Sequence, residues 1–195
     1  MSDYTVIWAI GKTLESLLKK SLENDFGDQV GIAFESPKEI KDDQNRKISI
    51  FLYQILENPH LKNEPLQRVD DIKLETPPLA IDLFYLFTVY GQNREDEMKL
   101  FGKVLQTFYD HSILTGSILQ QPPLETGEEI KLLLNPLSLD DLTKLWNTFQ
   151  DVPFKLSVSY MVTPVRIDST RELDVRRVVS KEMGYYQAMP KKEEK

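Results

Sequence analysis

The chain has 195 residues, 31 acidic against 24 basic side chains for a net charge of −7, 41% hydrophobic residues and no cysteine. This length and composition predict one globular domain with enough apolar residues for its own core. The absence of cysteine excludes disulfides, thiolate metal sites and cysteine nucleophiles. A net negative charge argues against broad binding to nucleic-acid phosphates, so we expect no nucleic-acid partner.

The first predicted element is an amphipathic helix over residues 4–23, because apolar side chains recur there at helical spacing. The residues that carry this spacing are Ile7, Ile10, Leu14 and Leu17. Lysine and glutamate interrupt the same stretch, so it does not match the apolar segment of a signal peptide. The most apolar run, 79–90, is too short to span a membrane as a helix. We therefore expect synthesis in the cytoplasm, release only as part of something larger, and no membrane partner.

The next predicted elements are strands. Residues 29–34 are short and partly β-branched, and residues 48–56 and 79–90 carry apolar side chains on both alternating faces. Two apolar faces are typical of interior strands that are covered on both sides. Between them, 58–76 is a long polar connection that we expect to contain a short hairpin near 66–74.

Gly91 ends the strongest strand, and an amphipathic helix is predicted over 94–111 behind a possible Asn93 cap. Residues 117–120 and 129–134 then favour two short strands that form a hairpin around a Pro-Pro to Gly turn.

Ser138 and Asp141 have the spacing of a capping box, which predicts a short helix that Pro153 ends. Residues 155–162 alternate between apolar and polar, as in a half-exposed antiparallel strand. The predicted fold class is α+β: a mixed, mainly antiparallel sheet flanked by the helices 4–23 and 94–111. The pattern does not determine the strand order.

No catalytic or cofactor motif is visible. His60 and His111 lack a metal-ligand spacing, and the neighbours Asp110-His111-Ser112 cannot converge as a hydrolytic triad. The scattered glycines form no nucleotide-binding loop. Adjacent carboxylates, as in Asp140-Asp141, are usually solvated or capping rather than catalytic. We expect no enzyme activity, no cofactor and no metal.

Three single residues invite interpretation. Asp82 interrupts the most apolar strand, where an unpaired charge is costly. It either faces solvent, or pairs with an arginine or lysine across the sheet, or is a buried carboxylate at an oligomer interface. Trp146 lies on the apolar stripe of its helix and is expected in the core, whereas Trp8 does not clearly lie on such a stripe.

Three segments together resemble the tail-terminator or cap proteins of contractile injection systems, the phage-tail-like particles. They are ISIFLYQILENPHLKN (48–63), TPPLAIDLFYLFTVYG (76–91), and LTKLWNTF (142–149) followed by PFKLSVSYMVTPVRID (153–168). With the two main helices, the resemblance covers about residues 4–170.

The resemblance implies an α+β subunit that forms a homohexameric ring on the end of the inner tube. Such a ring stops polymerisation and joins the last layer of the tube protein to the last layer of the sheath protein. The alternatives are a small soluble enzyme or ligand-binding domain, and an adaptor that loads cargo onto such particles. The number of subunits distinguishes these classes, because an isolated enzyme has no reason to form rings of six.

Residues 1–170 are expected to form the terminator-like domain, and 171–195 a C-terminal arm that is disordered from about 190. The arm combines apolar, aromatic and basic residues, which a solvated extension does not need. It either adds a strand to the sheet edge of a neighbouring subunit or folds back on its own. With Asp82, the candidate assembly residues are Arg171, Arg176, Arg177, Tyr185 and Tyr186.

Overall fold

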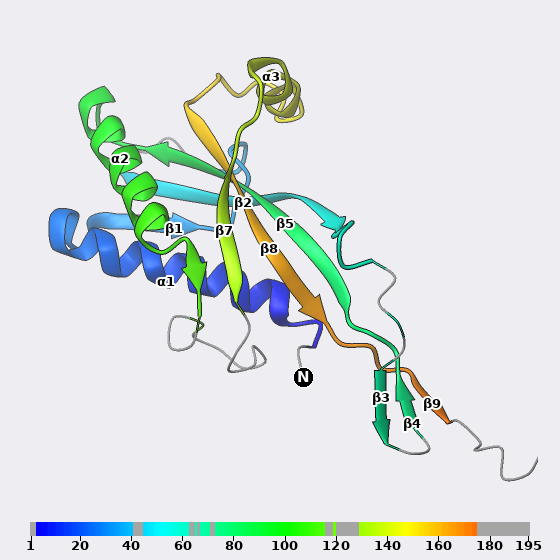
Figure 1. Cartoon of the computed structure of the whole chain (residues 1–195). Helices are drawn as coiled ribbons and strands as arrows, with labels where there is room; N and C mark the ends of the chain where they lie inside the picture. Colours follow the sequence, from blue (N-terminus) through cyan, green and yellow to red (C-terminus); the bar gives the residue numbers. More distant parts are fainter. Residues whose placement is uncertain are drawn as a thin grey trace, which may run out of the picture.

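The computed structural model describes residues 3–40, 45–62, 65, 67–70, 73–115, 119 and 129–174 (Figure 1). The helices are α1 (Val6–Phe26), α2 (Arg94–Asp110) and α3 (Leu139–Asn147), with a 3-10 turn at Gly27–Gln29. The strands are β1 (Val30–Ala33), β2 (Arg46–Glu57), β3 (Gln67–Asp70), β4 (Lys73–Glu75), β5 (Leu79–Tyr90), β6 (Ile113–Leu114), β7 (Ile130–Asn135), β8 (Ser157–Ile167) and β9 (Glu172–Asp174).

Six strands form the main sheet in the order β1-β2-β5-β8-β7-β6, and β3-β4-β9 form a smaller sheet. Only β1 and β2 pair in parallel in the main sheet; its other pairs are antiparallel. The predicted mixed, mainly antiparallel α+β architecture is confirmed. The predicted interior strands β2 and β5 each lie between two neighbours, and the hairpin expected near 66–74 is the β3–β4 pair.

The main core lies between the sheet and the helices α1 and α2, which cover the same face (Figure 1). Its centre contains Phe87, Phe108 and Tyr160, from β5, α2 and β8, with ring centroids 4.8 to 5.7 Å apart. Edge-to-face contacts of this kind add to the free energy gained from burying the rings. These contacts hold α2 to the central strands β5 and β8.

Gly91 makes the sharp transition from β5 to α2 possible. A Cβ atom at this position would lie 2.8 Å from the backbone nitrogen of Glu97, in the first turn of α2. The Asn93 side chain accepts a hydrogen bond from the Asp96 backbone nitrogen at 2.9 Å, so the predicted cap of α2 is confirmed.

The opposite face of the sheet has a smaller cover. Leu86 of β5 packs there against Trp146 and Phe149, so Trp146 lies in the core as expected. The predicted short helix is α3, and its Ser138 cap is confirmed by the hydrogen bond from the Asp141 backbone nitrogen. Figure 1 shows α3 over one end of the sheet, and within the described ranges no other helix covers this face.

Two strand predictions need correction. The partner of β7 is β6 at Ile113–Leu114; of the predicted strand 117–120 the structure describes only residue 119, which is in a bend. The strand predicted over 155–162 spans Ser157–Ile167 and is not half-exposed, because it lies between β5 and β7 with buried residues on both faces. Its apolar and polar alternation reflects two different covered faces: Tyr160 lies toward the main core, and Ser159 lies among polar partners.

Candidate assembly surfaces

Asp82 lies on β5 and is buried, with an exposed fraction of 7%. Its carboxylate accepts hydrogen bonds from the Asn58 amide at 2.9 Å and from the Thr163 hydroxyl. Asp82 therefore does not face solvent, and within the described residues its hydrogen-bond partners are neutral rather than an arginine or lysine. The register of β5 against β8 shifts at Asp82, and this shift brings Thr163 within reach of it.

The Asp82 cluster also fixes the connection after β2. Asn58 donates to Asp82 with its amide nitrogen, and its side-chain oxygen accepts from the backbone nitrogens of His60 and Leu61 at 3.0 and 3.2 Å. The carboxylate thus orients an Asx turn at the start of the long connection. A role of Asp82 at an oligomer interface stays a prediction.

Arg171 lies at the same end of the sheet as Asp82, because Leu79 of β5 pairs with Ile167 of β8. Arg171 is exposed and lines an open hollow of about 530 Å³ between the end of β8 and the connection before β5. Its backbone nitrogen donates to the Ser169 hydroxyl at 3.1 Å. A basic side chain is therefore available to solvent at this end.

The predicted arm begins as a strand of its own subunit. β9 pairs in antiparallel fashion with β4, with Leu173 opposite Leu74, and extends the β3–β4 hairpin to three strands. The first residues of the arm therefore fold back on the chain that carries them. Arg176, Arg177, Tyr185 and Tyr186 lie outside the described residues, as does the segment expected to be disordered from about 190.

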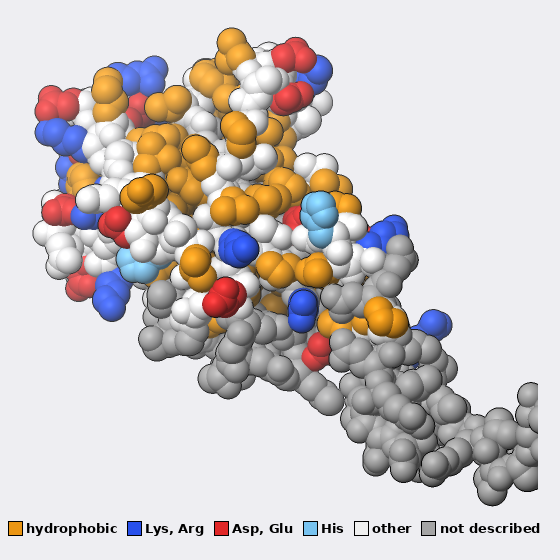
Figure 2. All heavy atoms as spheres, in the orientation of Figure 1, with side chains coloured by type: hydrophobic (Ala, Val, Ile, Leu, Met, Phe, Trp, Pro, Cys, Tyr) orange, Lys and Arg blue, Asp and Glu red, His pale blue; other side chains and the backbone are white. Residues whose placement is uncertain are grey.

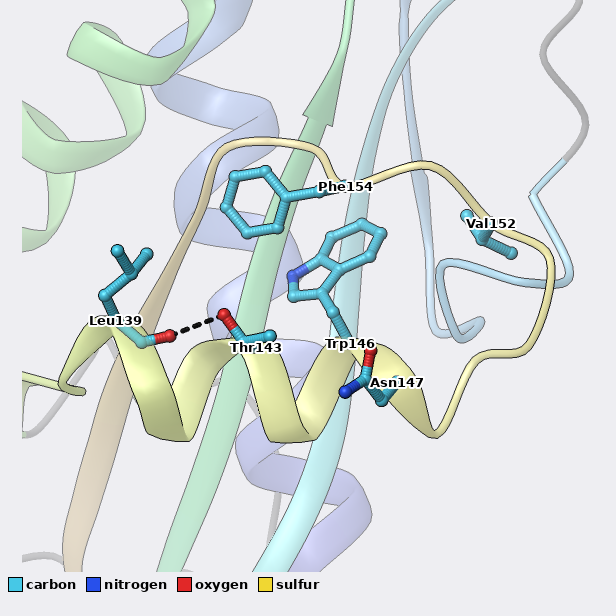
Figure 3. A pocket seen from close by; sticks show the side chains of 6 residues that line it. All are labelled: Leu139, Thr143, Trp146, Asn147, Val152 and Phe154. Atoms are coloured by element: carbon cyan, nitrogen blue, oxygen red, sulfur yellow. Dashed lines mark hydrogen bonds between the residues drawn. The ribbon is translucent and has the colours of Figure 1, made fainter.

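A third surface is a small hollow beside α3, shown in Figure 3. Its volume is about 220 Å³, and the residues that line it are Leu139, Thr143, Trp146, Asn147, Val152 and Phe154. The ring of Phe154 lies 5.4 Å from that of Trp146, and Thr143 donates to the Leu139 carbonyl at 2.7 Å. The chain turns back after α3 through Gln150 and Asp151, which have φ of 28° and 65°, and so places Val152 and Phe154 at the hollow.

The Trp146 indole contains a buried polar atom without a partner. The residue is 5% exposed, and its Nε1 makes no hydrogen bond within the described part of the chain. Figure 3 shows this nitrogen on the side of the ring that faces the hollow. Buried N–H groups are rarely left without an acceptor, and this donor lacks a partner that the described residues could supply.

An apolar groove of about 530 Å³ runs between α2 and β7. It is lined by Tyr109, which is 84% exposed, by Leu134, which is 56% exposed, and by Tyr160. Burial raises the pKa of Tyr160, so its phenol is neutral at physiological pH. Figure 2 shows hydrophobic side chains gathered over β7 and on α3. An apolar surface of this kind is typical of protein–protein contacts.

Among the described residues, no group of three or more histidine, aspartate and glutamate side chains could hold a metal ion. His111 contacts the Thr107 carbonyl through its ring nitrogen at 2.9 Å, which is an interaction of a helix end. In the same described ranges, no helix combines the length and apolarity that crossing a membrane requires.

Sequence reasoning found Asp82 and Trp146 but missed the α3 hollow. The hollow needs Val152 and Phe154 to return over α3, and this return depends on two left-handed residues that are not glycine. The sequence does contain one signal for the hollow: the short helix ends just before a proline and an aromatic residue, Pro153-Phe154.

A family model described as "Pvc16 N-terminal domain" matches residues 9–181. No curated protein sequence matches the chain.

Two solved structures have the same fold. One is the sheath/tube terminator of an extracellular contractile injection system, PVC, in the extended state, with a TM-score of 0.68 and 22% identity over 97% of this chain and 66% of that chain. The other is the tube-terminating cap of the anti-feeding prophage, AFP, with a TM-score of 0.60 and 18% identity over 88% of this chain and 60% of that chain. This chain thus spans slightly less than two thirds of the length of each protein.

Proposed function

This chain belongs to the Pvc16 N-terminal domain family, and we propose that it is a tail terminator that caps the inner tube of a contractile injection system. The observation that carries the proposal is the shared fold: both similar structures are tube-terminating proteins, and the match to the first extends over 97% of this chain. The expected α+β terminator fold and the family resemblance agree with it.

The proposed role is structural rather than catalytic. His111 contacts a carbonyl at a helix end, Asp141 belongs to a helix cap, and no metal-binding cluster is present among the described residues. Asp82, the most deeply buried aspartate named above, is held by Asn58 and Thr163 and orients a turn.

The proposed working form is a homohexameric ring that contacts the inner tube protein and the sheath protein. A closed ring needs heterologous contacts, in which one patch of each subunit meets a different patch of the next. The subunit has unlike ends that suit such contacts. α3 and its hollow lie at one end of the main sheet, and the β3-β4-β9 sheet lies at the other (Figure 1). The protein is then made in the cytoplasm and joins a particle that is released or anchored.

Deletion of the gene tests this function. An uncapped helical polymer keeps an open assembly surface, so nothing in its local contacts specifies a last layer. We expect tubes and sheaths of variable length, or particles that come apart, when the protein is missing. Electron microscopy of particles that carry a tagged chain should show it at one end, as a ring of six copies. Uniform, stable particles from the deletion strain would refute the terminator role.

A further inference from the structure

The hollow beside α3 contains a hydrogen-bond donor that its own subunit does not satisfy. Trp146 is 5% exposed, and its Nε1 faces the hollow without a partner in the described part of the chain (Figure 3). A buried donor left unpaired costs free energy that an incoming acceptor would recover. An occupant that brings an oxygen atom able to accept a hydrogen bond would therefore be favoured.

The walls and volume of the hollow indicate the polarity and size of a side chain that would fit it. Leu139 and Phe154 are 74% and 52% exposed beside it, so an apolar side chain would bury more surface there. Its volume of about 220 Å³ lies below the roughly 300–1,000 Å³ of small-molecule pockets. One large side chain together with a hydroxyl or backbone carbonyl oxygen fits these conditions, and tyrosine supplies both an apolar ring and an acceptor.

The rim of the hollow has a net negative charge. Asp140, Asp141 and Asp151 lie on α3 and in the turn after it, against one lysine, Lys144, a balance of −2. Figure 2 shows acidic and basic side chains at the end of the molecule where α3 lies. An occupant with a net positive charge is therefore favoured.

One segment of this chain combines all three properties. Residues 175–186 (VRRVVSKEMGYY) contain two adjacent tyrosines, and three basic side chains against one acidic, a balance of +2. We propose that Tyr185 or Tyr186 of a second copy enters the hollow beside Trp146 and accepts a hydrogen bond from its Nε1, while the basic residues face the acidic rim. This proposal rests on the proposed ring, which brings copies of the chain side by side.

The position of the arm favours a second copy over the same chain. The arm leaves the subunit after β9, which lies at the opposite end of the main sheet from α3 (Figure 1). β8, which runs between these ends, has 11 residues and is therefore about 35 Å long. A contact from one end of a subunit to the unlike end of the next is the heterologous contact that a closed ring requires.

Crosslinking tests the pair directly, because the chain has no cysteine of its own. One copy carries Thr143→Cys, at the hollow, and a second copy of different tagged mass carries Gln187→Cys, which keeps both tyrosines. A short bismaleimide is added to the mixed proteins at high concentration, and to particles purified from cells that express both. We expect the mixed dimer as the main product. Thr148→Cys is the matched control, since Thr148 is also an exposed threonine, just after α3, but does not line the hollow, and we expect at least about tenfold less product from it.

A filling variant gives a second measurement. Thr143→Phe places a large side chain in the hollow, and Thr148→Phe adds the same ring outside it. Hot-spot contacts of this kind are worth about tenfold or more in affinity. We expect Thr143→Phe to weaken self-association by about that factor and Thr148→Phe to leave it unchanged. Circular dichroism of both variants verifies that they are folded.

The outcomes separate this inference from the proposed function. If the mixed dimer is absent, or if only crosslinks within one chain form in a double-cysteine variant, the docking proposal is wrong, even when the protein caps tubes. If the mixed dimer forms but the protein is absent from particle ends, the terminator role is wrong and the contact stands.

Discussion

Arg46 at the start of β2 binds Asp96 in the first turn of α2 through three hydrogen bonds. Arg46 Nε lies 3.0 and 2.9 Å from the two carboxylate oxygens of Asp96, and its Nη2 lies 2.8 Å from Oδ1. The hydrogen bonds from Arg46 hold the pKa of Asp96 below its ordinary value, and the backbone of Gln92 adds a further donor. This paired geometry joins the sheet to the helix that covers it.

The Asp96 contact predicts a pH dependence of stability. Because the pKa of Asp96 is lower in the folded state than in the unfolded state, the contribution is present above the unfolded pKa and is lost as the pH falls through the folded one. We expect Asp96→Asn to lower the free energy of unfolding by about 1–3 kcal/mol at neutral pH. Urea unfolding at a series of pH values from 7 down to 3 measures the free energy of unfolding of both proteins. The variant should lose less stability than the natural chain over this range; equal losses would contradict the prediction.

Asp82→Ala should be strongly destabilising. The substitution leaves the Asn58 amide and the Thr163 hydroxyl, both buried, without their acceptor. We expect a loss of about 2–5 kcal/mol, since an unsatisfied buried donor costs about 1–3 kcal/mol. Asp82→Asn keeps one acceptor oxygen and should cost less. Thermal unfolding of both variants measures the difference, and an Ala variant as stable as the Asn variant would show that the carboxylate does not hold the cluster.

Ser138→Ala should loosen α3 and with it the cover of Trp146. Ser138 accepts a hydrogen bond from the Asp141 backbone nitrogen at 3.1 Å, and this is the side-chain cap of the helix. Loss of such a cap costs about 1 kcal/mol. Acrylamide quenching of a Trp8→Phe background, in which Trp146 is the only tryptophan, measures exposure. We expect weak quenching in that background and stronger quenching after Ser138→Ala.

The same experiment has an internal control in the other tryptophan. Trp8 is 53% exposed on α1, so a Trp146→Phe background should be quenched readily, and Ser138→Ala should not change this. A change at Trp8 would mean that the substitution disturbs the whole fold rather than α3.

Reversal of the arm charges should weaken assembly in a salt-dependent manner. Arg176→Glu with Arg177→Glu turns attraction to an acidic neighbour into repulsion, which salt screens. We expect weaker attachment at low salt and a smaller difference from the natural chain at high salt. Lys191→Glu with Lys192→Glu is the matched control, because it makes the same charge change beyond residue 190, where disorder is expected. Sedimentation at two salt concentrations measures the effect, and equal effects of both pairs would exclude a specific contact.

The sequence by itself determined the elements whose signals are local. The helical spacing of α1 and α2, the two apolar faces of β2 and β5 and the Ser138 cap depend only on residues near one another in the chain, and each was predicted within a few residues. The family resemblance followed from the same segments and is confirmed by the match over residues 9–181.

Only the tertiary structure decided the strand order, the partners of Asp82 and the hollow beside Trp146. Asp82 is 24 residues from Asn58 and 81 residues from Thr163, and the register shift that joins them is a property of paired strands rather than of one segment. The alternation in β8 predicted a half-exposed strand because spacing reports a difference between two faces but not what covers each. On one face of β8 the cover comes from the main core with α1 and α2, and on the other Ser159 meets Tyr53 and Asn135 of other strands. The positions of these elements depend on packing across the whole chain.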